Sequence, residues 1–371
     1  MRLGIIGTGR IAYRFVPETR YIEGVKVVSV YNPRKESAEK YAKKWEIEAF
    51  YEADLSHDEN GGEKKSQNPI NDNPNYKSNN NCGLETFLNT VDAVYIATPH
   101  ATHAEYIRTA LTHGKHVLCE KPMVLSEAEA KELFELAETN SLILMEGIKT
   151  AFCPGYKKLK EIAQSGVIGE LLYIESCFTK LESPDSRELT DTVTGGSFTE
   201  LGTYVMLPVL SLFGPRAKFN FQCILREDNI DIFTKCNVLY DDGKLATATC
   251  GLGVKSEGRL VIAGTKGYIL VPAPWWKTGK FEVHFEKASD VIYYEEKFDG
   301  DGLRYEIQEF FDLVQQVEKS HTNNEYIPGF ISETSQEDTT KPQTSNLISN
   351  DVISTFSIRM AGLIEEFLEC R

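Results

Sequence analysis

The stretch KHVLCEKP, residues 115–122, is a short apolar run that ends abruptly at two opposite charges and a proline. Its apolar part predicts a buried strand. In an open α/β sheet, ligands bind outside the carboxyl ends of the strands, which is where Lys121 would lie. Pro122 restricts the residue before it, so the lysine would be held on an extended turn. Lys121 is therefore either a ligand contact or an ordinary charged strand end, and the surrounding sequence has to decide between the two.

The N-terminus shows a second feature of the same kind of sheet. Residues 2–6 predict a strand. The six residues after them match the dinucleotide fingerprint, with alanine in the last small-residue position: Gly7, Thr8, Gly9, Arg10, Ile11 and Ala12. The glycines let the backbone turn tightly and approach a pyrophosphate, which the N-terminus of the following helix attracts. Because a second strand is predicted at residues 25–31, the pattern favours dinucleotide binding over a purely structural glycine turn.

The end of that second strand bears on the choice of cofactor. Asn32 lies where an acidic residue would accept a hydrogen bond from the adenosine ribose in an NAD enzyme. The acid is missing, and Arg34 and Lys35 follow, which suits a 2′-phosphate better than a bare ribose. Asn32 before Pro33 would also suit the start of a helix. On this pattern the sequence favours NADP(H) over NAD(H).

The order of elements predicts two domains. Residues 1–149 alternate strands and helices, which is typical of a doubly wound parallel sheet. Within them, residues 56–81 are polar and rich in asparagine, and we interpret them as a flexible surface insertion. Residues 150–371 contain successive strands between helices and predict an α+β domain with a mainly antiparallel sheet. The predicted fold class is α/β, an N-terminal Rossmann domain followed by this second domain.

One further strand end points to the same crevice. The strand predicted over residues 92–98 ends at Thr98, Pro99 and His100, on the same side of the sheet as Lys121. His100 and His103 lie three residues apart, but no third ligand is near them in the sequence. We therefore predict no metal site.

Composition excludes several classes of function. The 371 residues carry a formal net charge of -15, and no basic stripe offsets it, which argues against nucleic acid as a partner. No apolar run reaches membrane-spanning length, and the chain shows no secretory pattern before its first strand. The eight cysteines show no CxxC pair and suggest reduced core residues in a cytoplasmic protein.

With both halves in view, the chain resembles the Gfo/Idh/MocA oxidoreductase family over nearly its whole length. The resemblance rests on the fingerprint, on Ala97-Thr98-Pro99 with His103, on residues 114–122 and on the glycine-rich segment that ends at Tyr204. It implies a C-terminal α/β domain with an open sheet that binds a sugar or cyclic polyol and forms a homodimer or a dimer of dimers. The residues expected to bind the cofactor are Gly7, Thr8, Gly9, Arg10, Ile11, Asn32, Arg34, Thr98, Pro99, His100, Glu120 and Lys121.

The resemblance also implies which residues handle the proton. Many members have aspartate and histidine where this chain has Glu200 and Tyr204. Tyrosine at that place resembles the branch with glucose-fructose oxidoreductase and dihydrodiol dehydrogenase, in which a lysine and a tyrosine do the proton chemistry. We therefore expect Lys121 and Tyr204 to be catalytic, with Lys121 lowering the tyrosine pKa from its usual value of about 10. Glu200, four residues before Tyr204 on a helix, would orient either group. A buried structural tyrosine is the alternative.

The substrate pocket is less well marked. Trp276 and Tyr305 are candidate walls, although aromatic residues are often simply core, and Thr150 is a candidate contact. Ala151 stands where related sequences often have an arginine. The expected function is hydride transfer between nicotinamide and a sugar, polyol or related cyclic alcohol or carbonyl. A cofactor-binding regulator without catalysis is the alternative from another class.

Overall fold

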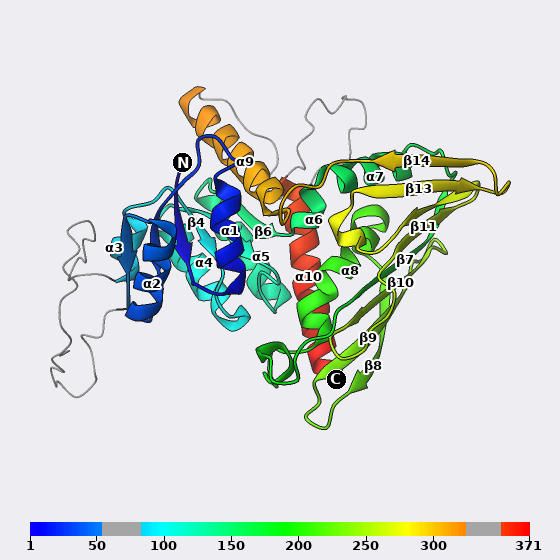
Figure 1. Ribbon diagram of the computed structural model, residues 1–371, viewed down its shortest axis with the longest axis horizontal. Coiled ribbons are helices and arrows are strands. Elements are labelled where there is room, and N and C mark those ends of the chain that lie inside the picture. The colour runs from blue at the N-terminus through cyan, green and yellow to red at the C-terminus, as the bar shows by residue number, and fades with distance from the viewer. Residues whose placement is uncertain (54–82, 324–349) are drawn as a thin grey trace.

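The fold consists of two β-sheets joined by helices, as the computed structural model shows (Figure 1). It describes residues 1–53, 83–323 and 350–371. The insertion predicted at 56–81 lies outside the described residues. The predicted fold class is confirmed: a parallel sheet comes first, and a mainly antiparallel one follows.

The first sheet is entirely parallel and has the spatial order β3-β2-β1-β4-β5-β6. Its strands are β1 (Arg2–Ile6), β2 (Lys26–Tyr31), β3 (Ala49–Tyr51), β4 (Ala93–Ile96), β5 (His116–Glu120) and β6 (Leu144–Gly147). β4, β5 and β6 are buried along their whole length, as expected for parallel strands covered on both faces. The chain order reverses between β1 and β4, and such a switch point opens a ligand crevice at the carboxyl ends of the strands.

Helices cover both faces of this sheet. One face packs against α1 (Arg10–Thr19), α2 (Lys35–Trp45) and α9 (Leu303–Asn323). The other packs against α3 (Leu84–Leu88), α4 (His103–Thr112) and α5 (Glu127–Thr139). Helix α9 therefore returns from late in the sequence to cover the first sheet. Helix α10 (Asn350–Cys370) lies between the two sheets and contacts both α5 and α8 (Ser197–Phe213) (Figure 1).

The second sheet has the order β14-β13-β12-β11-β7-β10-β9-β8. Its strands are β7 (Leu171–Thr179), β8 (Lys218–Leu225), β9 (Asp231–Leu239), β10 (Leu245–Gly251), β11 (Leu260–Gly264), β12 (Gly267–Val271), β13 (Lys280–Phe285) and β14 (Val291–Glu295). β7 and β10 pair in parallel, whereas the other neighbouring pairs are antiparallel. A tight turn joins β9 to β10, where Gly243 has a φ of 88°.

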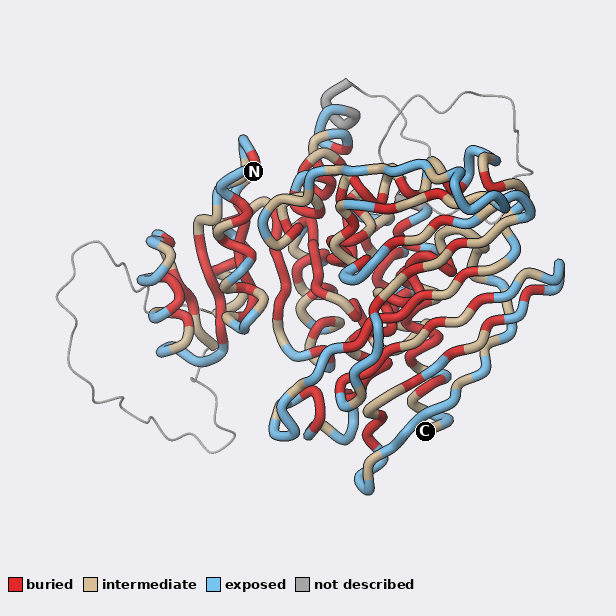
Figure 2. Tube along the Cα trace, turned by 45° about the vertical axis from the view of Figure 1, so that its right-hand side comes forward, coloured by how far each residue is buried: buried red, intermediate tan, exposed pale blue. Residues whose placement is uncertain are grey.

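One face of the second sheet is covered, and the other is open. Helices α7 (Pro154–Gln164), α8 and α10 pack with the strands into the largest hydrophobic cluster. Along inner strands such as β9, β10 and β13, buried residues alternate with intermediate or exposed ones (Figure 2). This alternation is the pattern of a sheet with one packed face and one accessible face. The buried face fixes α8, which carries Glu200 and Tyr204 toward the first sheet.

Candidate active site

The loop between β1 and α1 has the geometry of a diphosphate cradle. Gly7 has a φ of 97°, and a Cβ added to it would lie 2.5 Å from the carbonyl oxygen of Ala97. Only glycine fits such a close approach to β4 with that backbone. Gly9 is the N-cap of α1, and no side chain caps the helix there. The N–H groups of the first turn are therefore free to bind an anion, and the loop fits a dinucleotide.

Asn32 organises the adjoining loop. Its Nδ2 donates a hydrogen bond to Thr8 Oγ1 over 2.8 Å, and its Oδ1 accepts one from the Arg34 backbone N–H over 2.9 Å. The N-cap of α2 is Arg34, so Asn32 is not the helix cap. Lys35 Nζ lies 3.6 Å from Glu52 Oε1. Within the part of the chain that the structure describes, no hydrogen bond or ion pair holds the Arg34 guanidinium.

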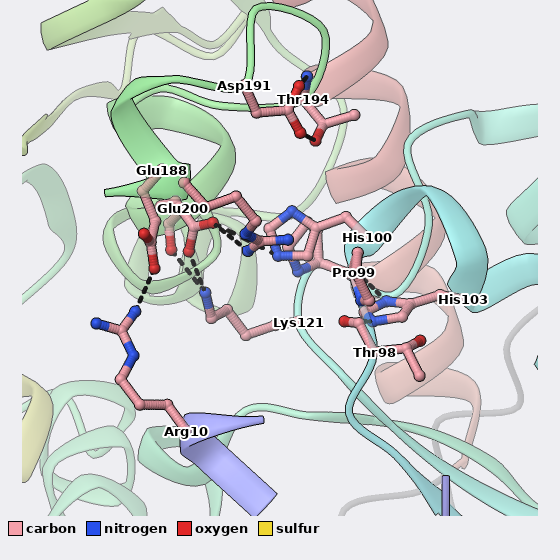
Figure 3. A network of polar contacts seen from close by, with 12 residues as sticks. Arg10, Thr98, Pro99, His100, His103, Lys121, Glu188, Asp191, Thr194 and Glu200 are labelled. Atoms are coloured by element: carbon pink, nitrogen blue, oxygen red, sulfur yellow. Dashed lines mark hydrogen bonds and ion pairs between the residues drawn. The ribbon is translucent and has the colours of Figure 1, made fainter. Parts of the chain in front are cut away.

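Lys121 and Glu200 meet at the carboxyl edge of the first sheet. Lys121 follows β5 directly, and Glu200 lies in the first turn of α8. The Lys121 Nζ donates to the backbone oxygen of Glu200 over 2.8 Å and lies 3.4 Å from its Oε2 (Figure 3). Both side chains are 13% exposed, so this contact is partly shielded from water. The second domain thus holds the lysine at the carboxyl edge of the first sheet.

Glu200 also gathers two other basic side chains. Its Oε1 lies 3.3 Å from Arg187 Nη2 and 3.6 Å from His100 Nε2 (Figure 3). Burial, and then the charge of Lys121, lower the pKa of His100 to about 2, so its ring is neutral at neutral pH. The ring nitrogens of His103 lie 2.9 Å from the Thr98 oxygen and 3.0 Å from the Pro122 oxygen. His103 thereby links the ends of β4 and β5 beneath the site.

Tyr204 lies beside this network but is not ionised by it. Its ring centroid is 5.8 Å from Lys121 Nζ. Burial raises the pKa of Tyr204, and the carboxyl groups of Glu120 and Glu306 raise it further. The expectation of a lowered tyrosine pKa is therefore wrong, because burial and the nearby carboxyl groups raise it. The phenol is protonated, which suits donation of a proton to a carbonyl oxygen.

The aromatic candidates differ in their surroundings. The Trp276 ring stacks on Phe178 at 3.5 Å, and Phe178 lies 5.4 Å from the Tyr204 ring. Trp276 therefore continues an aromatic wall that begins at Tyr204. Thr150 Oγ1 donates to the Trp276 backbone oxygen over 2.7 Å. The Tyr305 hydroxyl accepts from the Asp299 N–H over 2.7 Å, so this hydroxyl serves the local loop.

Glu120 is enclosed rather than open to the crevice. Its Oε1 accepts a hydrogen bond from the Tyr95 hydroxyl over 2.6 Å. Burial raises the pKa of Glu120, although Lys121 and Lys149 oppose that rise. Its carboxyl group therefore lies inside the sheet, while Lys121, the next residue, points across the crevice.

A short segment of the second domain reaches the cofactor loop. This segment, η2 (Arg187–Leu189), places Arg187 against Glu200 and pairs Glu188 with Arg10, the first residue of α1 (Figure 3). Sequence reasoning missed both residues, because no motif surrounds them. Arg14 lies one turn further along α1, and its Nε donates to Asp301 Oδ2 over 2.8 Å. Glu18 lies two turns further along, and its Oε2 accepts from Arg304 Nε over 2.7 Å. One face of α1 is thus tied to the second domain along its length.

We expect Glu188→Gln to tighten dinucleotide binding by about two- to fivefold. The carboxylate of Glu188 holds Arg10 at the end of the helix where a diphosphate would bind, and so competes with it. Exposed ion pairs contribute up to about 1 kcal/mol, and the Arg10 side chain is 72% exposed. Fluorescence titration with reduced cofactor measures the change. Glu182→Gln is the comparison variant, because Glu182 is the more distant partner of Arg10, at 4.0 Å, and its loss should therefore change cofactor binding less. Weaker binding in Glu188→Gln would show instead that the pair keeps the crevice in its binding shape.

Metal and membrane features are absent from the described part of the chain. Among residues 1–53, 83–323 and 350–371, no three His, Cys, Asp or Glu side chains are grouped so that they could hold a metal ion. The same residues contain no helix long and apolar enough to cross a membrane.

The two halves of the chain match two parts of one family. Residues 1–148 match the oxidoreductase family with an NAD-binding Rossmann fold, and residues 156–270 match the GFO/IDH/MocA C-terminal domain. The chain therefore belongs to the Gfo/Idh/MocA oxidoreductase family, as its sequence motifs predicted.

Curated relatives in this family include named dehydrogenases. Trans-1,2-dihydrobenzene-1,2-diol dehydrogenase of Bos taurus is 29% identical over 53% of this chain and 59% of that enzyme. The scyllo-inositol 2-dehydrogenase (NADP(+)) IolU of Bacillus subtilis (strain 168) is 30% identical over 58% of each chain. The match to these two relatives thus spans less than two thirds of their length.

Solved structures share the fold over the whole chain. KijD10, a 3-ketoreductase from Actinomadura kijaniata in complex with NADP and TDP-benzene, superposes with a TM-score of 0.73 at 21% identity, covering 98% of this chain and 96% of that one. The UDP-N-acetylglucosamine 3-dehydrogenase GnnA from Acidithiobacillus ferrooxidans gives a TM-score of 0.69 at 18% identity, covering 99% of each. At such identities the likeness shows the two-sheet fold.

Proposed function

We propose that the protein is an NAD(P)-dependent oxidoreductase that transfers a hydride between nicotinamide and a sugar, polyol or related cyclic alcohol or carbonyl. The observation that carries this proposal is the meeting of Lys121 and Tyr204. They come from different domains and lie together at the carboxyl edge of the parallel sheet, beside a loop that fits a diphosphate. The names of the curated relatives, a diol dehydrogenase and an inositol dehydrogenase, support the substrate class.

In this mechanism the residues of the chain bind, orient and move one proton. Gly7, Gly9 and the first turn of α1 would hold the diphosphate of the dinucleotide. Bound nicotinamide supplies or accepts the hydride. Tyr204 donates its phenolic proton to the substrate oxygen in reduction and receives it in oxidation. Lys121, held in place by Glu200, directs its ammonium toward the same oxygen and stabilises developing negative charge there.

Steady-state turnover tests this proposal against the alternative of a regulator. NADPH or NADP⁺ would be followed spectrophotometrically with a panel of sugars, inositols and their ketones. Turnover of at least one such compound is expected. A regulator needs a cofactor site but no proton donor, whereas here a protonated phenol and an ammonium lie together. Tight cofactor binding without turnover across the panel would favour the regulator.

We infer a preference for NADP(H) over NAD(H). Arg34 supports this preference: it follows β2, has no partner for its guanidinium among the described residues, and lies near Asn32, which carries no charge. Arg34→Ala should weaken NADPH binding by about 10-fold or more, because a charge-assisted hydrogen bond contributes about 1.5–3 kcal/mol. NADH, which lacks the 2′-phosphate, is the built-in control and should bind this variant almost unchanged. Titration of both cofactors measures the ratio, and a clear preference of the unmodified protein for NAD(H) would contradict the inference.

We also propose a homodimer formed through the open face of the second sheet. Strand register aligns an apolar row across that face, and its members Leu239, Leu245 and Tyr268 are 49%, 49% and 39% exposed. Exposed apolar patches of this kind mark association surfaces. Sedimentation analysis tests the proposed homodimer, and a monomer at high concentration would contradict it.

We propose the cytoplasm as the location of the protein. All seven cysteines that the structure describes are free, which suits a reducing compartment.

A further inference from the structure

Two lysines near the aromatic wall lack an anionic partner. Lys149 is the first residue of α6 (Lys149–Phe152) and is 7% exposed. Lys277 is the last residue of η3 (Trp275–Lys277), and its Nζ lies 5.9 Å from the Phe298 ring centroid. In the parts of the chain that the structure describes, neither ammonium makes a hydrogen bond or an ion pair. An ammonium buried without a partner is unfavourable, so the chain alone does not account for Lys149.

The structure holds these two lysines on neighbouring segments. Thr150, next to Lys149, donates its hydroxyl proton to the backbone oxygen of Trp276, next to Lys277, over 2.7 Å. The Trp276 ring then stacks on Phe178, which contacts Tyr204. Both lysines therefore flank the aromatic wall that leads to the proposed proton donor.

The electrostatics of this region favour an added anion. Burial lowers the pKa of Lys149, and the charges of Arg14 and Lys277 lower it further. Arg14 is paired with Asp301 over 2.8 Å, so one of these cations is already satisfied. Glu306 and Glu120 oppose the shift, but burial raises the pKa of both carboxyl groups. The carboxyl group of Glu306 also lacks a hydrogen-bond partner among the described residues. Neither carboxyl group forms an ion pair with Lys149 among those residues, so an added anion would still find an unpaired ammonium there.

We propose that the substrate carries an anionic group, a carboxylate or a phosphate ester, which Lys149 and Lys277 bind while the reacting carbon lies against Tyr204. This inference rests on the proposed function and narrows its substrate class from sugars in general to acidic or phosphorylated ones.

Matched substrates test the inference. Initial rates would be measured with the holoenzyme on a hexose, the corresponding uronic acid and the hexose 6-phosphate. The unmodified protein should show at least a 10-fold higher kcat/KM for one anionic form than for the neutral sugar, mainly through KM. Lys149→Met and Lys277→Met should each lower kcat/KM for that form by about 10- to 100-fold, the range of a charge-assisted hydrogen bond. The neutral sugar should lose much less, and Lys149→Arg should restore part of the loss.

A matched control shows whether the loss of activity on anionic substrates is specific to Lys149 and Lys277 or follows the removal of any lysine nearby. Lys280 lies three residues after Lys277 and pairs with Glu295 over 3.0 Å on the second sheet, with 69% of its side chain exposed. Lys280→Met should behave like the unmodified protein on all three substrates. Equal losses on neutral and anionic substrates in Lys149→Met and Lys277→Met would overturn the inference, as would a preference of the unmodified protein for the neutral sugar.

A binding measurement distinguishes failure of the inference from failure of the proposed function. Calorimetric titration of the protein with the three sugars, in the presence of NADP⁺, needs no turnover. Selective binding of an anionic form that is lost in Lys277→Met, without turnover of any sugar, would support the anion site and overturn the oxidoreductase. Turnover of sugars at rates that do not depend on their charge would support the oxidoreductase and overturn the anion site. Lys277 is the less buried of the two lysines, so this variant should fold even if Lys149→Met does not.

Discussion

Tyr204→Phe should lower kcat by about 10²- to 10⁴-fold and leave cofactor affinity unchanged. The variant removes one hydroxyl and keeps the ring that packs on Phe178 at 5.4 Å. If that hydroxyl transfers the proton, its loss removes general acid–base catalysis, for which this range is typical. Stopped-flow or steady-state rates on a good substrate measure the loss, and cofactor titration shows whether binding is kept.

The pH dependence should identify the tyrosine as the group responsible. Burial keeps the pKa of Tyr204 above its ordinary value, so the phenol is protonated through the neutral range. Reduction of a carbonyl uses that protonated form and should be nearly independent of pH there. Oxidation of an alcohol needs the deprotonated form, so its rate should rise with pH, and Tyr204→Phe should flatten the rise.

A structural tyrosine provides the control for this prediction. Tyr156 of α7 is buried, and its hydroxyl lies 3.1 Å from Ser211 Oγ. Tyr156→Phe should therefore reduce stability slightly and leave kcat unchanged. Near-normal turnover in Tyr204→Phe would mean that Tyr204 is a wall of the pocket and that another group carries the proton.

The parts of this protein that sequence predicts best are those set by local pattern. The first strand, residues 2–6, agrees in both its ends with β1. Gly7 predicts the cradle because only glycine allows that backbone so close to Ala97 at the end of β4. The end of β5 predicts the position of Lys121, since parallel strands bring their carboxyl ends to one edge. The fold class and the family followed from these motifs and are confirmed.

What the sequence does not predict depends on contacts between distant segments. Arg187 and Glu188 reach Glu200 and Arg10 only because η2 is folded back over the crevice. The protonated state of Tyr204 follows from its burial near two carboxyl groups, Glu120 and Glu306, which lie far apart in the sequence. The periodicity of helices and the alternation of strands contain no information about which distant segments come into contact.

Lys121→Met should reduce turnover by a factor similar to that of Tyr204→Phe, about 10²- to 10⁴-fold, and should also weaken cofactor binding. The methionine keeps most of the volume of the stem but loses the ammonium, which lies 2.8 Å from the Glu200 backbone oxygen. That ammonium lies 5.8 Å from the Tyr204 ring centroid, at the edge of the sheet where we propose that the dinucleotide binds. Its loss should therefore affect both the substrate oxygen and the bound dinucleotide. In Lys121→Met the turnover rate should therefore fall while the cofactor dissociation constant rises. In Tyr204→Phe only the rate should fall.

Lys115→Met is the matched control for Lys121→Met, because Lys115 precedes the same strand at its opposite end. Its Nζ donates to the Val91 oxygen over 2.9 Å, far along β5 from the crevice, so the variant should lower the melting temperature without changing kcat. If Lys121 and Tyr204 act as one unit, the double variant should be little slower than the slower single variant. Glu200→Gln should be milder, since the backbone oxygen of residue 200 still accepts a hydrogen bond from Lys121 in that variant. Losses that multiply independently would contradict a shared proton-transfer step, and each residue would then act on a separate part of the reaction.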